Sequence, residues 1–183
     1  TITGTLSGSY NSAEIAKKIY LEEHPNANIH VIDSLSAGGE VDLLVRKLNH
    51  LVAEGLDFDQ VLDAITAYQA KTKLLFVLAK VDNLVKNGRL SKLVGTVVRL
   101  LNIRMVGEAS KTGTLELLQK ARGQKKAIKA AFDELIKAGY TGGHITIAHR
   151  NNDKFIEQFS ELIREKFAQA SIEVLPTSGL CSF

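Results

Sequence analysis

The first ten residues hold the densest group of side chains that could do chemistry. Thr1–Tyr10 reads Thr-Ile-Thr-Gly-Thr-Leu-Ser-Gly-Ser-Tyr, with five aliphatic hydroxyls and two glycines. Hydroxyls and free backbone N–H groups at the start of a helix form a site for an anion. Neutral donors suit a carboxylate that must be held and then released, because each hydrogen bond contributes only about 1 kcal/mol net. The alternative is a plain capping turn without a ligand.

This loop matches none of the common catalytic or phosphate-binding motifs. It lacks the Gly-Lys-Ser/Thr of a Walker loop and the spacing of a GxGxxG fingerprint. Ser7 does not lie in a G-x-S-x-G elbow, and the sequence offers no His and Asp that can be paired with it. The loop therefore does not predict nucleophilic catalysis.

Two other positions could take part in chemistry. Asp33 stands beside Ser34 and Ser36 at the end of an apolar stretch, where α/β proteins often bind ligands, or else it caps the loop that follows. His149 is either a general base or anion ligand, or a surface histidine satisfied by its own turn. With only Asp153 as a partner, it does not make a hydrolase. We find no complete active site and predict that the protein is not an enzyme.

Composition excludes several functional classes. The 183 residues are 45% hydrophobic and carry a net charge of +3, enough apolar material for a real core. The single cysteine, Cys181, rules out internal disulfides and a Cys-based zinc site, so we expect neither metal nor cofactor. A basic cluster between Lys120 and Lys129 has no aromatic residues within it, which favours a solvated helix face over nucleic-acid binding. No membrane span or signal peptide is visible, which favours a cytoplasmic setting.

The elements that must position these residues alternate in the first half of the chain. Thr1–Ser9 reads as a strand leading into a loop, and Ser12 or Asn11 is the expected cap of a helix through residues 13–20. Apolar spacing predicts a strand at 29–33, helices at 41–52 and 58–68, and a buried strand at 74–78, with Asp57 capping the third helix. This alternation predicts a mostly parallel sheet with helical crossovers.

The second half has a different pattern. We predict helices at 82–91, 93–101, 124–137 and 152–167, and strands at 103–107, 114–119, 145–149 and 172–175. The first two strands flank a hairpin-like turn at 109–113. The fold class is therefore α/β with two lobes, residues 1–90 and 91–183, and the second lobe contains a smaller mixed or antiparallel sheet.

Five segments in order resemble the DegV family. The first pair is Leu6-Ser7-Gly8-Ser9-Tyr10-Asn11-Ser12-Ala13 followed by Val31-Ile32-Asp33-Ser34. The others are Leu84-Val85-Lys86-Asn87-Gly88-Arg89-Leu90-Ser91, Lys120-Ala121-Arg122-Gly123-Gln124-Lys125-Lys126-Ala127 and His149-Arg150-Asn151-Asn152. Each alone is weak, but together they span nearly the whole chain in the family's order.

The resemblance implies a lipid carrier. DegV proteins hold a long-chain fatty acid in a tunnel between two lobes and present it to a separate fatty acid kinase subunit, which makes an acyl phosphate for phospholipid synthesis. Ser7 is then the best candidate for a carboxylate ligand, with Thr3 and Thr5 as alternatives. Arg89 and Arg122 become candidates for contact with phosphate or kinase, since guanidinium binds oxyanions bidentately. Transient contact with a membrane is compatible with this role.

The chain also departs from the family pattern. It begins at Thr1 without the family's N-terminal Asp-Ser-Ser and Thr-Ser-Gln-Pro segments, and we expect it to be truncated at both ends. Where the family often has Gly-Thr-His-Thr-Gly-Pro-Gly, this chain reads Gly179-Leu180-Cys181-Ser182-Phe183, so Cys181 stands near the place of a histidine ligand. These departures predict that this chain binds the family's ligand poorly or binds a different ligand.

Two rival functions remain open from the sequence. One is a phosphoryl- or acyl-transfer enzyme that uses the same hydroxyl-rich loop as an anion cradle. The other is a regulatory or nucleic-acid-binding module that uses the basic helix between Arg122 and Lys129. Turnover of acyl or phosphate esters would favour the first, and steeply salt-dependent binding of oligonucleotides would favour the second.

Overall fold

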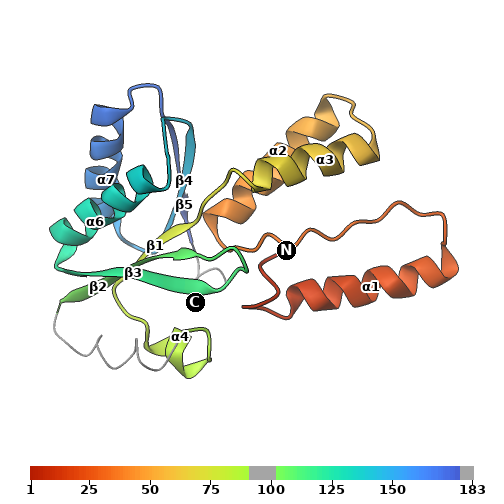
Figure 1. Cartoon of the computed structure of the whole chain (residues 1–183), viewed down its shortest axis with the longest axis horizontal. Coiled ribbons are helices and arrows are strands. Elements are labelled where there is room, and N and C mark those ends of the chain that lie inside the picture. Colours follow the sequence, from red (N-terminus) through yellow and green to blue (C-terminus); the bar gives the residue numbers. More distant parts are fainter. Residues whose placement is uncertain (91–101, 178–183) are drawn as a thin grey trace. The chain divides into compact units, whose positions relative to one another are not determined.

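The computed structural model describes residues 1–90 and 102–177, which form two compact units. The first unit is Thr1–Thr72 together with Ser110–Thr114, and the second is Lys73–Ala109 together with the described residues from Leu115 onward. The described part holds six helices and two sheets, which confirms the α/β class (Figure 1). No described helix combines the length and apolar character needed to cross a bilayer.

The first unit contains the helices α1 (Ser9–Glu23), α2 (Gly39–Ala53) and α3 (Phe58–Gln69). The helices α2 and α3 pack through Leu44, Leu51 and Ile65, which are almost fully buried. A reciprocal cap starts α3 as predicted: the Asp57 carboxylate accepts from Gln60 N at 2.9 Å, and Gln60 Oε1 accepts from Asp57 N at 3.1 Å.

The start of α1 differs from the prediction. Gly8 is the N-cap and makes no side-chain hydrogen bond, and Ser12 N already donates to Gly8 O at 2.9 Å. The predicted cap at Ser12 or Asn11 is therefore wrong, because the hydroxyl-rich loop passes directly into the helix and both residues lie in its first turn. Within the described part, α1 buries none of its residues, and Ile19 is 58% exposed.

The mostly parallel sheet expected in the first half is not formed by the described residues. Residues 29–33 are extended but belong to no strand. They are hydrogen-bonded to the start of the chain at one point, in the pattern of a parallel pair: Thr1 N donates to Ile32 O at 2.8 Å, and Ser34 N donates to Thr1 O at 3.2 Å. One such bridge does not form a pair of β-strands, which requires hydrogen bonds over several residues.

The strand β1 (Leu75–Leu78) forms where predicted but has an antiparallel partner. It pairs with β2 (Ile103–Ala109), which pairs in turn with β3 (Leu115–Arg122), both antiparallel. All four residues of β1 are only partly buried. The apolar run indicated a strand correctly, but apolar character alone does not determine the direction of a partner that lies far away in the sequence.

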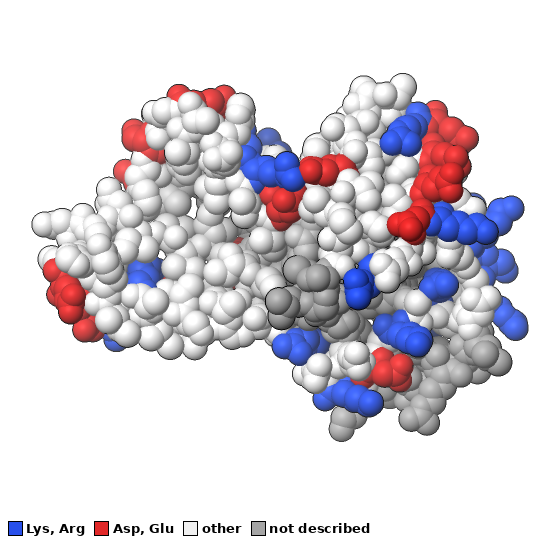
Figure 2. Space-filling model, turned by 180° about the vertical axis from the view of Figure 1, so that it is seen from behind, with Lys and Arg blue, Asp and Glu red and all other residues white. Residues whose placement is uncertain are grey.

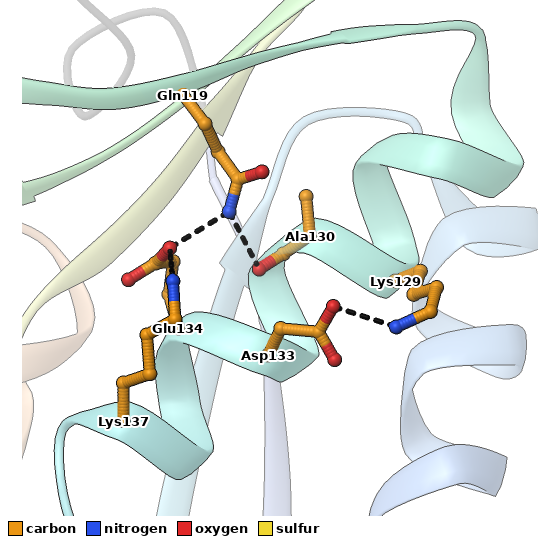
Figure 3. A network of polar contacts seen from close by, with 6 residues as sticks. All are labelled: Gln119, Lys129, Ala130, Asp133, Glu134 and Lys137. Atoms are coloured by element: carbon orange, nitrogen blue, oxygen red, sulfur yellow. Dashed lines mark hydrogen bonds and ion pairs between the residues drawn. The ribbon is translucent and has the colours of Figure 1, made fainter.

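In the second unit, helix α6 (Gln124–Lys137) packs on the three-stranded sheet through Val106, Ala121 and Ala127. A polar contact adds to this packing: Gln119 Nε2 on β3 donates to Glu134 Oε1 at 2.7 Å (Figure 3). Lys137 Nζ donates to the same carboxylate oxygen at 2.8 Å, and this bond raises the pKa of Lys137. The partly buried Glu134 carboxylate is thus both hydrogen-bonded and charge-paired.

The strands β4 (His144–His149) and β5 (Ser171–Pro176) are parallel and are joined through α7 (Asp153–Lys166). A helical crossover is what a parallel pair requires. Together with the antiparallel sheet, this pair confirms the predicted mixed second lobe.

The predicted boundary at residues 90 and 91 adjoins a segment outside the described residues, as does the predicted helix at 93–101. The compact units divide after Thr72 instead. The reason is that β1 pairs with β2, and α4 (Asp82–Lys86) packs Leu84 against Met105.

Candidate functional site

The segment Thr3–Ser9, here named the hydroxyl loop, is anchored by Asp33. The Asp33 carboxylate accepts from Gly4 N at 3.2 Å and from Leu35 N at 2.9 Å. The Asp33 carbonyl accepts from Gln69 Nε2 of α3 at 2.8 Å. Asp33 therefore caps its own loop, as one of the two interpretations predicted. Its carboxylate also holds the hydroxyl loop, while its carbonyl is held by α3.

Thr3 and Thr5 form a hydrogen-bonded chain with a definite direction. Thr5 Oγ1 donates to Gly113 O at 2.7 Å, and Thr3 Oγ1 lies 3.0 Å from Thr5 Oγ1. A hydroxyl has only one proton to donate. Because the Thr5 proton goes to Gly113, Thr3 must be the donor to Thr5. Both hydroxyl protons are thus used inside the protein, and Thr3 is fully buried.

Ser7 is placed differently. Its hydroxyl is half-buried and donates to Ser9 Oγ at 3.2 Å, while Ser9 N donates to Ser7 Oγ at 3.3 Å. Ser9 is exposed, so an incoming acceptor can replace it as the partner of the Ser7 proton. The first turn of α1 holds no acidic side chain, and the positive end of the helix dipole favours an anion there. Of the three predicted ligands, Ser7 has the most available donor.

Ser36 is a further candidate that the sequence did not predict, a buried serine whose hydroxyl makes no hydrogen bond within the described residues. It is 1% exposed, and Ser36 Oγ has no hydrogen-bond partner among the described residues. Its backbone is well held: Ser36 O accepts from Thr3 N at 2.9 Å, and Ser36 N donates to Ser34 Oγ at 3.1 Å. The sequence showed both serines beside Asp33, but no pattern in it distinguishes a satisfied hydroxyl from an unsatisfied one.

The two predicted arginines lie in the second unit. Arg89 follows α4 and is partly buried, with its backbone N donating to Leu84 O at 2.8 Å. Arg122 is exposed at the end of β3, directly before Gly123, the N-cap of α6. No acidic residue occupies the first turn of α6. Their predicted contact with phosphate or a kinase stays a prediction.

The residues of the basic cluster are exposed: Lys120, Arg122, Lys125, Lys126 and Lys129. A solvated helix face and a nucleic-acid-binding surface would both be exposed, so the choice between them stays a prediction. On the face that Figure 2 shows, most of the lysine and arginine side chains gather on the lower right of the view, with mostly neutral surface between them. No group of three or more His, Cys, Asp or Glu in the described ranges could hold a metal ion.

His149 is satisfied by its own turn. Its ring Nδ1 accepts from Asn152 N at 3.4 Å, and its carbonyl accepts from Thr177 N at 2.7 Å. The Asp153 carboxylate lies 3.8 Å from the ring and is almost entirely exposed. These contacts fit the turn interpretation of this histidine, although its side chain is only 12% exposed, and its role as a base or anion ligand stays a prediction. Cys181 and its neighbours lie outside the described residues.

Two surface hollows lie away from the hydroxyl loop. One, of about 570 Å³, runs along α1 beside Ile15 and Leu21. The other, of about 620 Å³, lies over α6 and α7 beside Ile128, Phe132 and Leu162. Ser7 lines neither of them, so the predicted acyl tunnel stays a prediction.

Comparison with known proteins decides the family. A family model described as "Uncharacterised protein, DegV family" matches residues 1–183. The chain belongs to the DegV family. A DegV domain-containing protein of Streptococcus gordonii is 74% identical over all 183 residues, which make up 65% of that relative. The chain thus spans about two thirds of the length of the curated DegV relatives it matches.

Two solved structures are also similar over the whole chain. The Fatty Acid Kinase (Fak) B3 protein of Streptococcus pneumoniae, loaded with linoleic acid, has a TM-score of 0.96 at 75% identity, and the match covers 65% of it. A DegV family protein from Eubacterium eligens, loaded with heptadecanoic acid, has a TM-score of 0.94 at 40% identity, and the match covers 66% of it.

Proposed function

We propose that this protein binds a long-chain fatty acid and holds its carboxylate at the hydroxyl loop. One observation carries the proposal: the Fak B3 protein, which is similar to this chain over all 183 of its residues, was crystallised with linoleic acid. The acyl tail would lie in the tunnel that the family resemblance implies. Linoleic and heptadecanoic acids share a carboxylate and a long apolar chain, so the common ligand class is the long-chain fatty acid.

Ser7 is the principal carboxylate ligand in this proposal. Its hydroxyl proton is held only by the exposed Ser9, whereas the protons of Thr3 and Thr5 are committed within the protein. Its position directly before α1 places the carboxylate near the positive end of that helix. Ser7 donates a neutral hydrogen bond, which permits release of the acid.

The loaded protein has no catalytic step of its own in this proposal. It presents the carboxylate to a separate kinase, which forms the acyl phosphate. Arg89 and Arg122 then contact the kinase or its phosphate, because a guanidinium group binds oxyanions bidentately. The printed name of the Fak B3 protein supports a link to a fatty acid kinase.

Mass spectrometry tests the ligand. Denatured extracts of the purified protein should contain long-chain fatty acid in an amount comparable to the protein. An extract without fatty acid, from a folded sample that also fails to take up added linoleic acid, would refute the proposal.

Substitution of Ser7 tests the site. Ser7→Ala should weaken binding of linoleic acid by about 1–3 kcal/mol, or roughly 5- to 150-fold in Kd, because one hydrogen bond to a charged group is lost. Titration calorimetry measures the change. Ser12→Ala, an exposed serine one turn further along α1, is the matched control and should bind normally. Equal affinity of the Ser7 variant and the control would remove Ser7 from the site.

A further inference from the structure

The turn between β2 and β3 lies directly against the hydroxyl loop. This turn, Ser110–Thr114, belongs to the first compact unit together with Thr3 and Thr5. Its own hydrogen bonds hold its shape: Ser110 N donates to Thr114 O at 2.8 Å, and Gly113 N donates to Ser110 O at 2.9 Å. The turn thus presents the Gly113 carbonyl to the Thr5 hydroxyl from a preformed position.

Gly113 meets two requirements that other residues do not. Its φ of +77° is a conformation that residues with a Cβ rarely adopt. A Cβ added there would also collide with Thr3 Oγ1 and lie only 2.9 Å from Thr3 Cβ and 3.1 Å from the Leu35 backbone. The turn can therefore approach the hydroxyl loop this closely only because Gly113 has no side chain.

We propose that Gly113 is a positioning residue for the fatty-acid carboxylate site. Its carbonyl takes the Thr5 proton and so sets the direction of the chain from Thr3 to Thr5 to Gly113. Thr3 O in turn accepts from Leu6 N and Ser7 N, both at 3.1 Å. Through these bonds, the turn fixes the backbone that carries the Ser7 hydroxyl, although Ser7 and Gly113 are 106 positions apart in the sequence.

The proposal rests on the proposed function for its link to ligand binding, but its geometric part has a separate test. Hydrogen exchange reports directly on the Leu6 and Ser7 amides, which bond to Thr3 O. If the turn positions the loop, Gly113→Ala should speed exchange at these two amides at least tenfold without a ligand. Mass spectrometry or NMR measures the rates.

Gly55→Ala is the matched control. Gly55 has a φ of +78°, nearly the same as Gly113, but a Cβ there meets nothing within 4 Å. Both variants bear similar backbone strain, so the difference between them lies in the close contacts that a Cβ at Gly113 makes with Thr3 and with the Leu35 backbone. Gly55→Ala should keep loop protection and affinity for linoleic acid at the wild-type level, whereas Gly113→Ala should lose affinity at least tenfold.

Thr5 variants test the hydroxyl chain and cover the case in which Gly113→Ala does not fold. Thr5→Val removes the bond to Gly113 O and should speed exchange at Leu6 and Ser7, whereas Thr5→Ser keeps the hydroxyl and should restore protection. Combined with Gly113→Ala, Thr5→Val should add little further loss of affinity, since both act on one bond.

The outcomes separate the two proposals. Unchanged exchange at Leu6 and Ser7 in both Gly113→Ala and Thr5→Val would overturn the positioning role. If exchange rises as expected but the wild-type protein binds no linoleic acid, the positioning of the loop stands and the proposed function fails.

Discussion

At the scale of single residues, hydroxyls of the same chemical type have very different availability. Thr3 donates its hydroxyl proton to Thr5, and Thr5 donates its own to Gly113 O, whereas Ser7 donates to an exposed serine. Ser36 is buried with no partner in the described ranges. The value of each hydroxyl to a ligand is therefore set by its neighbours and not by its residue type.

Ser34 and Ser36 allow a direct test of this difference. They are 2% and 1% exposed, but within residues 1–90 and 102–177 only Ser34 Oγ is bonded, donating to Ser36 O and accepting from Ser36 N. Ser34→Ala should lower the free energy of unfolding by about 1–2 kcal/mol, whereas Ser36→Ala without ligand should cost clearly less. Urea unfolding of both variants measures the difference. Equal costs would show that Ser36 Oγ has a partner in solution.

Tyr68 predicts a loss of stability at alkaline pH. Burial raises the pKa of its phenol, and the nearby Glu40 carboxylate raises it further. The folded protein thus holds the phenol proton more tightly than the unfolded chain, so this stabilisation is complete below the ordinary pKa of about 10 and is lost as pH rises through the folded pKa. In Tyr68→Phe, the free energy of unfolding should fall less as the pH rises past about 10. Urea unfolding below and above this pH measures the fall.

Tyr20→Phe is the control for Tyr68. Tyr20 lies on α1 and is half exposed. Its substitution should leave the alkaline loss of stability unchanged, and an equal effect of the two substitutions would contradict the assignment to Tyr68.

At the scale of secondary-structure elements, a side-chain cap begins only α3 among the described helices, and glycines with positive φ follow the ends of α2, α4 and α6. The reciprocal Asp57–Gln60 cap starts α3, and α6 ends just before Gly139, whose φ is +88°. The helix α1 starts without a side-chain cap, as do α2, α4, α6 and α7, and it buries none of its described residues. We therefore expect α3 to be more sensitive to local substitutions at its start than α1.

The cap of α3 gives a prediction at this scale. Asp57→Ala should lower the free energy of unfolding by about 1 kcal/mol, because the amide of Gln60 loses its acceptor. Asp63→Ala, which removes an exposed carboxylate from the middle of the same helix, should change stability by less than about 0.5 kcal/mol. Thermal unfolding followed by circular dichroism compares the two. An equal loss would assign the effect to charge instead of capping.

At the scale of the whole molecule, two compact units each have their own apolar core. The first unit is centred on Leu44, Leu51 and Ile65, and the second contains the cluster of Val106, Ala121 and Ala127. A ligand that binds only the folded protein stabilises it in proportion to the logarithm of its concentration over Kd. Stability is therefore a readout of the proposed ligand that does not require a chemical assay.

Linoleic acid should raise the free energy of unfolding by about 2.7 kcal/mol at a free concentration of 100 times Kd. Linoleyl alcohol has the same tail without a carboxylate and should stabilise much less at equal concentration. Scanning calorimetry with each compound measures the shifts. Equal stabilisation by the acid and the alcohol would mean that the carboxylate is not recognised.

The sequence by itself determined the elements whose signals are local. The Asp57 cap, the apolar spacing of α2, α3, α6 and α7, and the turn between β2 and β3 all depend on residues a few positions apart. The ordered motifs around Ser7, Asp33, Arg89 and Arg122 also identified the DegV family, which the match over residues 1–183 confirms. Capping and amphipathic packing act within about one or two helical turns, so they can be read from a short segment.

Only the tertiary structure decided which distant groups meet. The direction of β1 depends on β2, and the commitment of the Thr5 proton depends on Gly113, 108 positions away. That Ser36 Oγ finds no hydrogen-bond partner in the described part of the chain likewise depends on the distant segments that surround it. A strand ladder and a hydroxyl bond both need a partner of the right geometry, and a sequence lists possible partners without saying which of them folding brings within 3 Å or so.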